Sequence, residues 1–372
     1  MIDYLAESVE TRKLTSSKPW LKACFMSSIP TTLHLIPYDG IGGVEVAARS
    51  LPVGDHGDLR FGRVYLSAKG GAHPADPDIW TGPSDSEWAL ANYLGALRHL
   101  QRRKPDLLIV SLWRSAIVAL LAKLLRPRLK LVVFLHLDRP VHLPDRLLHA
   151  VLIRLAHDIW ADSAGTLAAR VPDGRKGRVI SFVTERLEPL PPARPVPKFI
   201  FWGRLHAQKG LDRALDILEA LKAHYPDTAL TLIGPDGGQE AALRAQAARL
   251  GLTVAFTGPL PRDQIFARAA GHSFFLMPSH SEGMAMSVVE AMQLGLVPVV
   301  TPVGEIGRYA QDGQNALLLG DGTSQDNAAR LAALLADPDQ VTRMARAAVD
   351  RFAHAGLYRE DVLAACREVL DR

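Results

Sequence analysis

The sequence is poor in cysteine, in aromatic residues and in long apolar runs. Its two cysteines, Cys24 and Cys366, lie near opposite ends of the chain without the spacing of a disulfide framework or a zinc site. No apolar run approaches the roughly eighteen residues of a membrane-spanning helix, and the N-terminus lacks the apolar region of a signal peptide. We therefore expect a cytoplasmic protein that spans no membrane.

The charge balance is also modest, with a net charge of +4, 22% charged residues and 48% hydrophobic residues over 372 residues. No aromatic-basic repeat accompanies the small basic excess, so we expect no nucleic-acid partner. This length and apolar content predict two folded domains with sizeable cores.

Lysine and arginine gather in one stretch, residues 98–130, which holds a single acidic residue, Asp106. Its segment AIVALLAKLLRPRLK is apolar on much of its surface and basic at its end. Such a helix suits peripheral contact with an anionic membrane on its cytoplasmic face. The alternative is a solvated basic face of a helix.

Strand and helix patterns alternate in the first half of the chain, which is typical of a doubly wound α/β domain. Residues 84–87, Ser-Asp-Ser-Glu, read as a capping box for a helix that ends near Arg103. We expect the other elements as strands at 31–37, 106–110, 129–135, 158–162 and 179–183, and helices at 44–51, 113–125 and 144–157.

The stretch LEPLPPARPVPK, residues 187–198, contains five prolines and can continue neither a helix nor a central strand. It predicts an interdomain linker. We place an N-terminal extension at 1–30, a first Rossmann-like domain at 31–188, the linker at 189–197 and a second Rossmann-like domain at 198–354.

The segment 278–301, PSHSEGMAMSVVEAMQLGLVPVVT, holds two glutamates, Glu282 and Glu290, between apolar strands at 274–277 and 297–300. The strand, loop, helix, strand order predicts a βαβ unit, with Glu282 in a loop at the carboxyl edge of the sheet. The N–H groups that begin the helix favour an anion such as phosphate. An alternative is that Glu282 favours the helix dipole and Glu290 is a surface residue.

Two further loops have phosphate-binding chemistry. Gly42 and Gly43 follow the first strand, and glycines there let a ligand approach backbone N–H groups. Arg204 and Lys209 follow the strand at 199–202; an arginine fork and a lysine point charge both suit a diphosphate. Either loop could also be an ordinary turn.

His136 directly follows the apolar strand LVVFL, at an edge where active sites collect, and Asp138, Arg139 and His142 come next. Alone, such a histidine would be an ordinary loop residue. An Asp-x-Asp tripeptide at 76–78 has the letters of a metal-binding motif but lies in a Pro-rich loop, so we expect no metal there.

These motifs together resemble the retaining family 4 glycosyltransferases, which have the GT-B fold. The family pattern is a glutamate and glycine, a second glutamate after seven residues, then Ala-Met, a glycine and Pro-Val-Val; here it reads Glu282-Gly283, Glu290-Ala291-Met292, Gly295 and 298–300. Gly42-Gly43-x-Glu and Gly203-Arg204 with Lys209-Gly210 resemble the family's other loops. The lysine that glycogen and starch synthases carry before the paired glycines is absent.

The resemblance implies an α/β GT-B architecture: two Rossmann-like doubly wound domains facing a central cleft, with a C-terminal helix in 355–372 that crosses back to the first domain. It implies catalytic-site roles for His136, Glu282, Arg204 and Lys209, and candidate acceptor contacts for Asp138, Arg139 and His142. It implies donor-binding roles for Gly42, Gly43, Gly203, Arg204, Lys209, Gly234, Leu260, Glu282, Gly283, Met284, Ala285 and Glu290.

The implied activity is retaining transfer of a hexose-type sugar from a UDP- or GDP-sugar to a saccharide or lipid-linked acceptor in bacterial polysaccharide or glycolipid synthesis. No cofactor and no metal are expected. Two alternatives stay open: a GT-B enzyme of another class, such as a sugar-nucleotide epimerase, and a non-catalytic nucleotide-sugar-binding scaffold.

Overall fold

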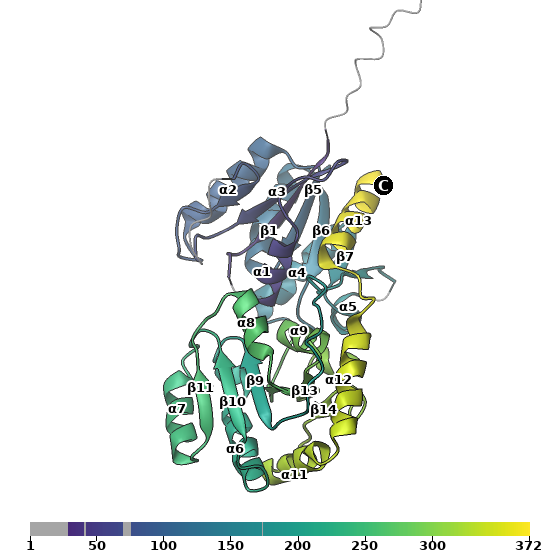
Figure 1. Ribbon diagram of the computed structural model, residues 1–372. Helices are drawn as coiled ribbons and strands as arrows, with labels where there is room; N and C mark the ends of the chain where they lie inside the picture. Colours follow the sequence, from purple (N-terminus) through teal and green to yellow (C-terminus); the bar gives the residue numbers. More distant parts are fainter. Residues whose placement is uncertain (1–28, 41, 70–75, 173) are drawn as a thin grey trace, which may run out of the picture.

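The computed structural model describes residues 29–40, 42–69, 76–172 and 174–372 and arranges them in two α/β domains (Figure 1). Nearly all of the expected N-terminal extension, residues 1–30, lies outside the described residues, and so does Cys24. Within those ranges no helix has the length and apolarity that a membrane crossing requires.

The first domain is built on an eight-stranded sheet in the order β2-β3-β1-β5-β6-β7-β8, with β4 paired to β3. Its strands pair in parallel except β2 with β3. Near-continuous apolar runs such as LLIVS in β5 form its central strands, because both faces of a parallel sheet are covered by helices. The elements are β1 (Thr31–Ile36), α1 (Gly43–Ser50), β2 (Gly54–Asp55), β3 (Arg60–Tyr65), β4 (Ile79–Thr81), α2 (Leu90–Arg103), β5 (Leu107–Ser111), α3 (Trp113–Leu125), β6 (Lys130–Leu135), α4 (Leu143–Leu155), β7 (Asp158–Ala161), α5 (Ala164–Arg170) and β8 (Arg178–Val179).

The second domain has a six-stranded, fully parallel sheet in the order β11-β10-β9-β12-β13-β14. Apolar side chains of β9, β12 and α9 meet in its core, where Phe199 stacks on Phe274. The elements are β9 (Lys198–Trp202), η2 (Ala207–Lys209), α6 (Leu211–Lys222), β10 (Ala229–Ile233), α7 (Glu240–Arg249), β11 (Thr253–Phe256), α8 (Arg262–Ala269), β12 (Phe274–Met277), α9 (Met286–Gln293), β13 (Val297–Val300), α10 (Ile306–Tyr309), β14 (Leu317–Leu318), α11 (Ser324–Leu335) and α12 (Pro338–Phe352).

The last helix, α13 (Tyr358–Asp371), returns to the first domain, as predicted (Figure 1). Its apolar side packs on the sheet face that α1 also covers, whereas α2, α3 and α4 cover the opposite face. The Tyr358 N–H donates to the Val183 carbonyl (2.8 Å), and Lys130 Nζ donates to two carbonyls at the end of α13. Two doubly wound domains and this returning helix confirm the predicted fold class.

The proline-rich segment 187–198 forms neither helix nor strand until β9 begins at Lys198. It packs against the second domain, because the Leu187 N–H donates to the Gln293 side chain and the Leu190 N–H to the Leu294 carbonyl. The path between the domains is therefore anchored at the end of α9.

Two local predictions are wrong. Residues 84–87 do not cap α2, which begins later, at Leu90, without a side-chain cap; the Glu87 carboxylate binds Lys69 and Arg114 instead. The strand expected at 179–183 is shorter: only β8, Arg178–Val179, is paired in the sheet. The residues after it leave the sheet edge, because their side chains pack into the cores and the Val183 carbonyl accepts from α13.

Candidate functional site

Most of the predicted site residues come from loops at the carboxyl ends of central strands. In the second sheet β9 lies between β10 and β12, and in the first sheet β1 lies between β3 and β5. At such points the chain order reverses and the loops diverge, which creates the ligand crevice of open α/β sheets. The loop after β9 carries Arg204 and Lys209, the loop after β12 carries Glu282, and the loop after β1 carries Gly42.

The second-domain loops are packed so closely that glycine is required. A Cβ on Gly210, which has a φ of 63°, would lie 2.1 Å from the Pro278 carbonyl oxygen, and one on Gly234 would lie 1.9 Å from that of Gly203. The ammonium of Lys209 lies 2.7 Å from a carboxylate oxygen of the largely buried Glu282. Backbone contact and an ion pair together fix the β9 and β12 loops relative to each other.

The helix after this loop, α9, begins without a side-chain cap. Its N-cap residue, Ala285, is in the left-handed region, with a φ of 53°, a conformation that costs about 1–2 kcal/mol for a residue with a Cβ. The loop before it is held in place, because the carbonyls of Gly283 and Met284 accept from the Glu305 N–H and the Tyr309 hydroxyl. Uncapped N–H groups of a fixed helix end are a ready anion site.

A second uncapped helix N-terminus faces the first across the domain boundary. Helix α1 has Gly42 as its N-cap and no side-chain cap. A Cβ on Gly43 would lie 3.3 Å from the sulfur of Met286, the first residue of α9, so the two helix starts approach each other. The carboxylate of Glu45 lies against Gly42, so a side chain at position 42 would have to displace it. The positive ends of two helix dipoles thus meet at one place.

Arg204 brings a full positive charge to the same place. Its side chain is exposed, and it has no hydrogen bond or ion pair to the residues that the structure describes. The guanidinium lies near enough to Glu45 of the first domain to act on its pKa, which burial raises and which the charges of Arg49 and Arg204 partly lower. An unpartnered arginine beside two helix N-termini can bind a phosphate through two oxygens.

Glu290 lies within α9, where Trp202 Nε1 donates to one carboxylate oxygen at 2.7 Å and Arg262 to the other at 2.8 Å. Burial raises the pKa of Glu290, and the two donors only partly offset this. Arg262 also contacts Thr184 and Glu185, which lead into the linker. The carboxylate is therefore held in one orientation by donors from two other elements, β9 and α8.

His136 belongs to a chain of neutral groups in the first domain. Its Nε2 lies 2.9 Å from the Ser111 hydroxyl, which is 2.8 Å from His34 Nε2. Burial lowers the pKa of His34 to about 3 and that of His136 well below its ordinary value, so both imidazoles are neutral at pH 7. The buried Nδ1 of His136 has no partner among the described residues. Leu112, after Ser111, is strained, with a φ of 65°.

Gly283 brings the second-domain loop against His136. A Cβ built on Gly283 would lie 3.5 Å from the His136 carbonyl oxygen and 3.9 Å from a carboxylate oxygen of Asp162. Burial raises the pKa of Asp162 to about 6, with a further contribution from the charge of Glu305, while hydrogen bonds from Thr166 and Ser163 oppose the shift. Three strand ends, those of β6, β7 and β12, therefore meet at this point.

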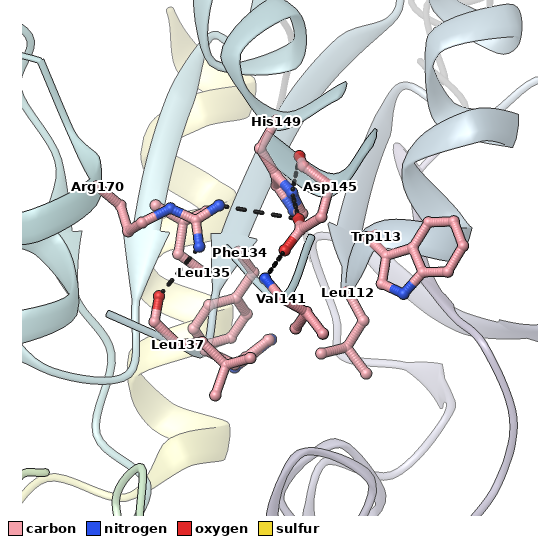
Figure 2. Close-up of a pocket in the computed structure, with 10 residues that line it drawn as sticks. Leu112, Trp113, Phe134, Leu135, Leu137, Val141, Asp145, His149 and Arg170 are labelled. Carbon is pink, nitrogen blue, oxygen red and sulfur yellow. Dashed lines mark hydrogen bonds and ion pairs between the residues drawn. The ribbon is translucent and has the colours of Figure 1, made fainter. Parts of the chain in front are cut away.

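A small, mainly apolar pocket of about 30 Å³ lies beside His136, and the residues that line it include none of the three acceptor candidates (Figure 2). Asp138 and Arg139 are exposed, whereas His142 caps α4 by accepting from the Asp145 N–H. In Figure 2, Asp145 sits between His149, the Val141 N–H and the guanidinium of Arg170. Burial alone would raise the pKa of Asp145, but hydrogen bonds from His149 and the Val141 N–H hold it below its ordinary value.

The Asp-x-Asp tripeptide has other partners. The carboxylate of Asp78 pairs with Arg60 at 2.7 Å and Arg103 at 2.9 Å, and Asp76 accepts from the Asp78 N–H. Two guanidinium groups satisfy the Asp78 charge that a cation would need. In the described ranges, no three His, Cys, Asp or Glu side chains gather as a metal site would require. Independence from metal remains a prediction.

The structure thus brings most predicted residues to one boundary and leaves others apart. Gly203 and Gly234 support the β9 and β10 loops by backbone contact, and Leu260 packs at the edge of the second core. Sequence reasoning missed the roles of three polar groups: Trp202, Arg262 and the buried carboxyl of Asp162, whose pKa is raised. Only Trp202 had a signal in the sequence: it is the last residue of the strand before Gly203-Arg204, so its side chain could be expected at the same sheet edge.

Comparison with solved structures defines the class of fold. HepE of Anabaena, in a crystal structure with UDP, superposes with a TM-score of 0.71 over 91% of this chain and 100% of that one, at 18% identity. Sucrose-phosphate synthase of Thermosynechococcus elongatus gives 0.73 over 91% and 98%, at 15% identity. The chain has the GT-B fold of glycosyltransferases.

Sequence comparison gives matches over the second domain. The profile described as glycosyl transferases group 1 matches residues 185–351, which are the second domain and the segment leading into it. Glycogen synthase of Mycobacterium tuberculosis is 30% identical over 156 residues, 41% of this chain and 37% of that protein. D-inositol 3-phosphate glycosyltransferase of Nocardia farcinica is 30% identical over 174 residues, 45% and 38%. The chain thus spans little more than a third of the length of these relatives.

Proposed function

We propose that the protein is a retaining glycosyltransferase, which moves a hexose-type sugar from a UDP- or GDP-sugar to a saccharide or lipid-linked acceptor. One observation carries the proposal: the uncapped N-termini of α1 and α9 face each other beside Arg204 and Lys209. This collection of positive groups suits a diphosphate, and it needs both domains.

The positive groups would act on the leaving group. As the bond to the anomeric carbon breaks, negative charge grows on the diphosphate, and fixed donors aimed at it stabilise the transition state more than the ground state. Arg204 is free to bind two phosphate oxygens, while Lys209 is shared with Glu282. We propose that these charges and the helix N–H groups make a metal ion unnecessary.

The two glutamates would recognise the rest of the donor. Glu290, oriented by Trp202 and Arg262, would accept from the ribose hydroxyls. Glu282 and the backbone of Gly283–Ala285 would orient the sugar, and the free Nδ1 of His136 would meet it from the first domain. The titles of related solved structures, HepE with UDP and with UDP-glucose, support a UDP-sugar as the first donor to test.

The anomeric configuration would be retained if the acceptor hydroxyl attacks the sugar on the same face from which the diphosphate leaves. The leaving phosphate would take the proton of that hydroxyl. The carboxylates are held by Lys209 and by Trp202 with Arg262, and so do not form the acid and base pair of a glycosidase. Closure of the domain boundary over the donor would exclude water. We place the reaction in bacterial polysaccharide or glycolipid synthesis at the cytoplasmic side of the membrane.

The test is thermal stabilisation by UDP-, GDP- and ADP-sugars with EDTA present, on the wild type, Arg204→Ala, Glu290→Ala and the matched control Arg346→Ala on α12. A ligand that binds only the folded state raises the melting temperature. The proposal predicts a shift with one nucleotide class that persists in EDTA and in Arg346→Ala and is lost in the two site variants. The absence of any shift in the wild type would overturn the proposal, because it would show that the protein binds none of these nucleotide sugars.

A donor that binds is next incubated with acceptor extracts, and the anomeric configuration of the product is read by NMR. Transfer with retained configuration supports the proposal. Conversion of the sugar nucleotide into its epimer without any acceptor would assign the protein to the epimerase class instead.

A further inference from the structure

The exposed large hydrophobic side chains are distributed unequally between the domains. Among the residues that the structure describes, every one of them belongs to the first domain or its leading residue, and most lie on α2, α3, α4 and the loop before α4. They are Ile29, Trp88, Leu90, Leu94, Leu121, Leu124, Leu125, Leu137, Val141, Leu143, Leu147, Val151 and Val179. Contiguous exposed apolar surface on a folded domain marks an interaction site.

Helix α4 shows the pattern most clearly. Leu143, Leu147 and Val151 recur every four residues, so they form one stripe along the helix, and they are 64%, 58% and 42% exposed. The opposite side of α4 packs on the sheet through buried Leu152 and Ile153. The stripe is therefore additional to the core-facing side.

Helix α3 extends this surface. It packs against α2 on one side and α4 on the other, within the layer that covers one face of the sheet. Its last turns expose Leu121, Leu124 and Leu125, in the outer side of that layer. We define the α3–α4 face as Leu121, Leu124, Leu125, Val141, Leu143, Leu147 and Val151.

The rim of the α3–α4 face is basic. Arg146 and Arg154 are exposed on α4, and Arg128 is exposed just after α3. The acidic residue of α4, Asp145, is buried and bound by His149 and the Val141 N–H, so its charge does not face outward. Apolar side chains with a cationic rim suit a surface that offers both hydrocarbon and negative charge.

We propose that the α3–α4 face binds the surface of a membrane that contains anionic lipids, with the leucines in the interface and the arginines at the headgroups. A second copy of this chain is the poorer occupant, since self-association through one face would bring its own arginines together. The segment 98–130, which the sequence indicates, supplies only the α3 half; the α4 stripe lies beyond it.

The position of the α3–α4 face bears on the choice of acceptor, and this inference rests on the proposed function. Val141 at its edge also lines the pocket beside His136 (Figure 2). A protein docked through α4 would hold that pocket near the membrane surface, so the proposed acceptor is the lipid-linked kind.

The test is sedimentation with vesicles of phosphatidylcholine alone or with about 30% phosphatidylglycerol. Leu143→Gln/Leu147→Gln removes apolar contact while keeping good helix formers, and Arg146→Gln/Arg154→Gln removes charge. Arg343→Gln/Arg346→Gln on α12 of the second domain is the matched charge control. We expect the wild type and the control to bind the anionic vesicles and each face variant to lose about tenfold in partitioning.

Failure of the wild type to bind anionic vesicles, or unchanged binding by both face variants, would overturn the proposal. So would a dimer in light scattering that Leu143→Gln/Leu147→Gln dissociates, because it would assign the face to self-association. Circular dichroism melts check that each variant folds, and the arginine pair decides the question if the leucine pair does not fold. Because binding is measured without a nucleotide, the result is independent of whether the donor site is correct.

Discussion

The two domains hold their functional side chains by different means. In the second domain ion pairs do so, with Lys209 on Glu282 and Arg262 on Glu290. In the first, His136 is held by a neutral hydroxyl, and burial keeps its imidazole uncharged. The second domain therefore has the charges that the proposed diphosphate site needs, and the first would offer uncharged groups and helix N–H donors to the rest of the proposed reaction.

The two domains also differ in the apolar side chains that they expose. Among the described residues, the second domain exposes no large hydrophobic side chain, whereas helices α2, α3 and α4 of the first expose many. A domain that binds a soluble nucleotide needs no exposed apolar surface outside its binding cleft. A half that meets an apolar or lipid-linked partner gains from apolar surface.

The largest effect on this difference between the domains is expected from removing the unpaired charge of Arg204 in the second domain. In Arg204→Ala we expect transfer to fall about 10²–10³-fold, as when one fixed donor to a developing anion is lost. The melting temperature should stay the same, because Arg204 is exposed and unpaired among the described residues. Steady-state kinetics beside Arg346→Ala make the measurement. Activity within about twofold of wild type would show that the diphosphate binds elsewhere.

The rigidity of the second-domain loops is tested by Gly210→Ala. The left-handed backbone costs about 1–2 kcal/mol with a Cβ present, and the added clash with the Pro278 carbonyl should at least double the loss. Gly313→Ala is the matched control, because it has a φ of 69° but open space around it. Urea unfolding of both variants gives the difference. Equal losses would mean that the β9 and β12 loops are not held by backbone contact.

Glu290→Gln tests whether the charge of Glu290 serves nucleotide binding. The variant keeps the shape of the side chain but removes its charge, and Arg262 keeps Glu185 as a carboxylate partner. Nucleotide affinity should fall roughly 10–100-fold, the value of one or two charged hydrogen bonds. Calorimetric titration with the stabilising nucleotide measures it. If affinity is unchanged while stability falls, Glu290 serves the domain and not the ligand.

The smallest expected effect lies at the boundary between the domains. Asp162 has a pKa of about 6, above its ordinary value, so the folded state holds the proton more tightly than the unfolded state. The free energy of unfolding therefore falls as pH rises from about 4 to 6, and stays lower above that. Asp162→Asn, which cannot ionise, should raise the melting temperature by about 3 °C at pH 8. Below about pH 4, where the carboxyl is protonated in both states, the substitution should change little. A shift independent of pH would contradict the assignment.

The sequence predicts the architecture well where the signal is local. Apolar runs bounded by turns locate β12 and β13 to the residue, and helix α3 begins and ends as expected at Trp113 and Leu125. The loops at strand ends then follow from the rules of parallel sheets. For this reason the candidate residues of the second domain could be placed at one sheet edge in advance, whereas their roles in binding stay a prediction.

What the sequence could not give is set by partners distant in the chain. Glu87 looks like a capping residue, but Arg114 and Lys69 compete for its carboxylate once α3 is in place. The partners of Glu290 and the raised pKa of Asp162 arise only when strands far apart are packed side by side. The exposed stripe of α4 is likewise an outcome of packing, since an apolar residue in a helix pattern is normally assigned to the core.

The most direct test of a diphosphate site shared by both domains is a crystal structure with the nucleotide that stabilises the protein. We expect the diphosphate between the N-termini of α1 and α9, in contact with the Gly43 N–H, Arg204 and Lys209, without a bridging cation. A nucleotide bound wholly within one domain, or a cation on Asp76 and Asp78 holding the phosphates, would contradict the proposed site.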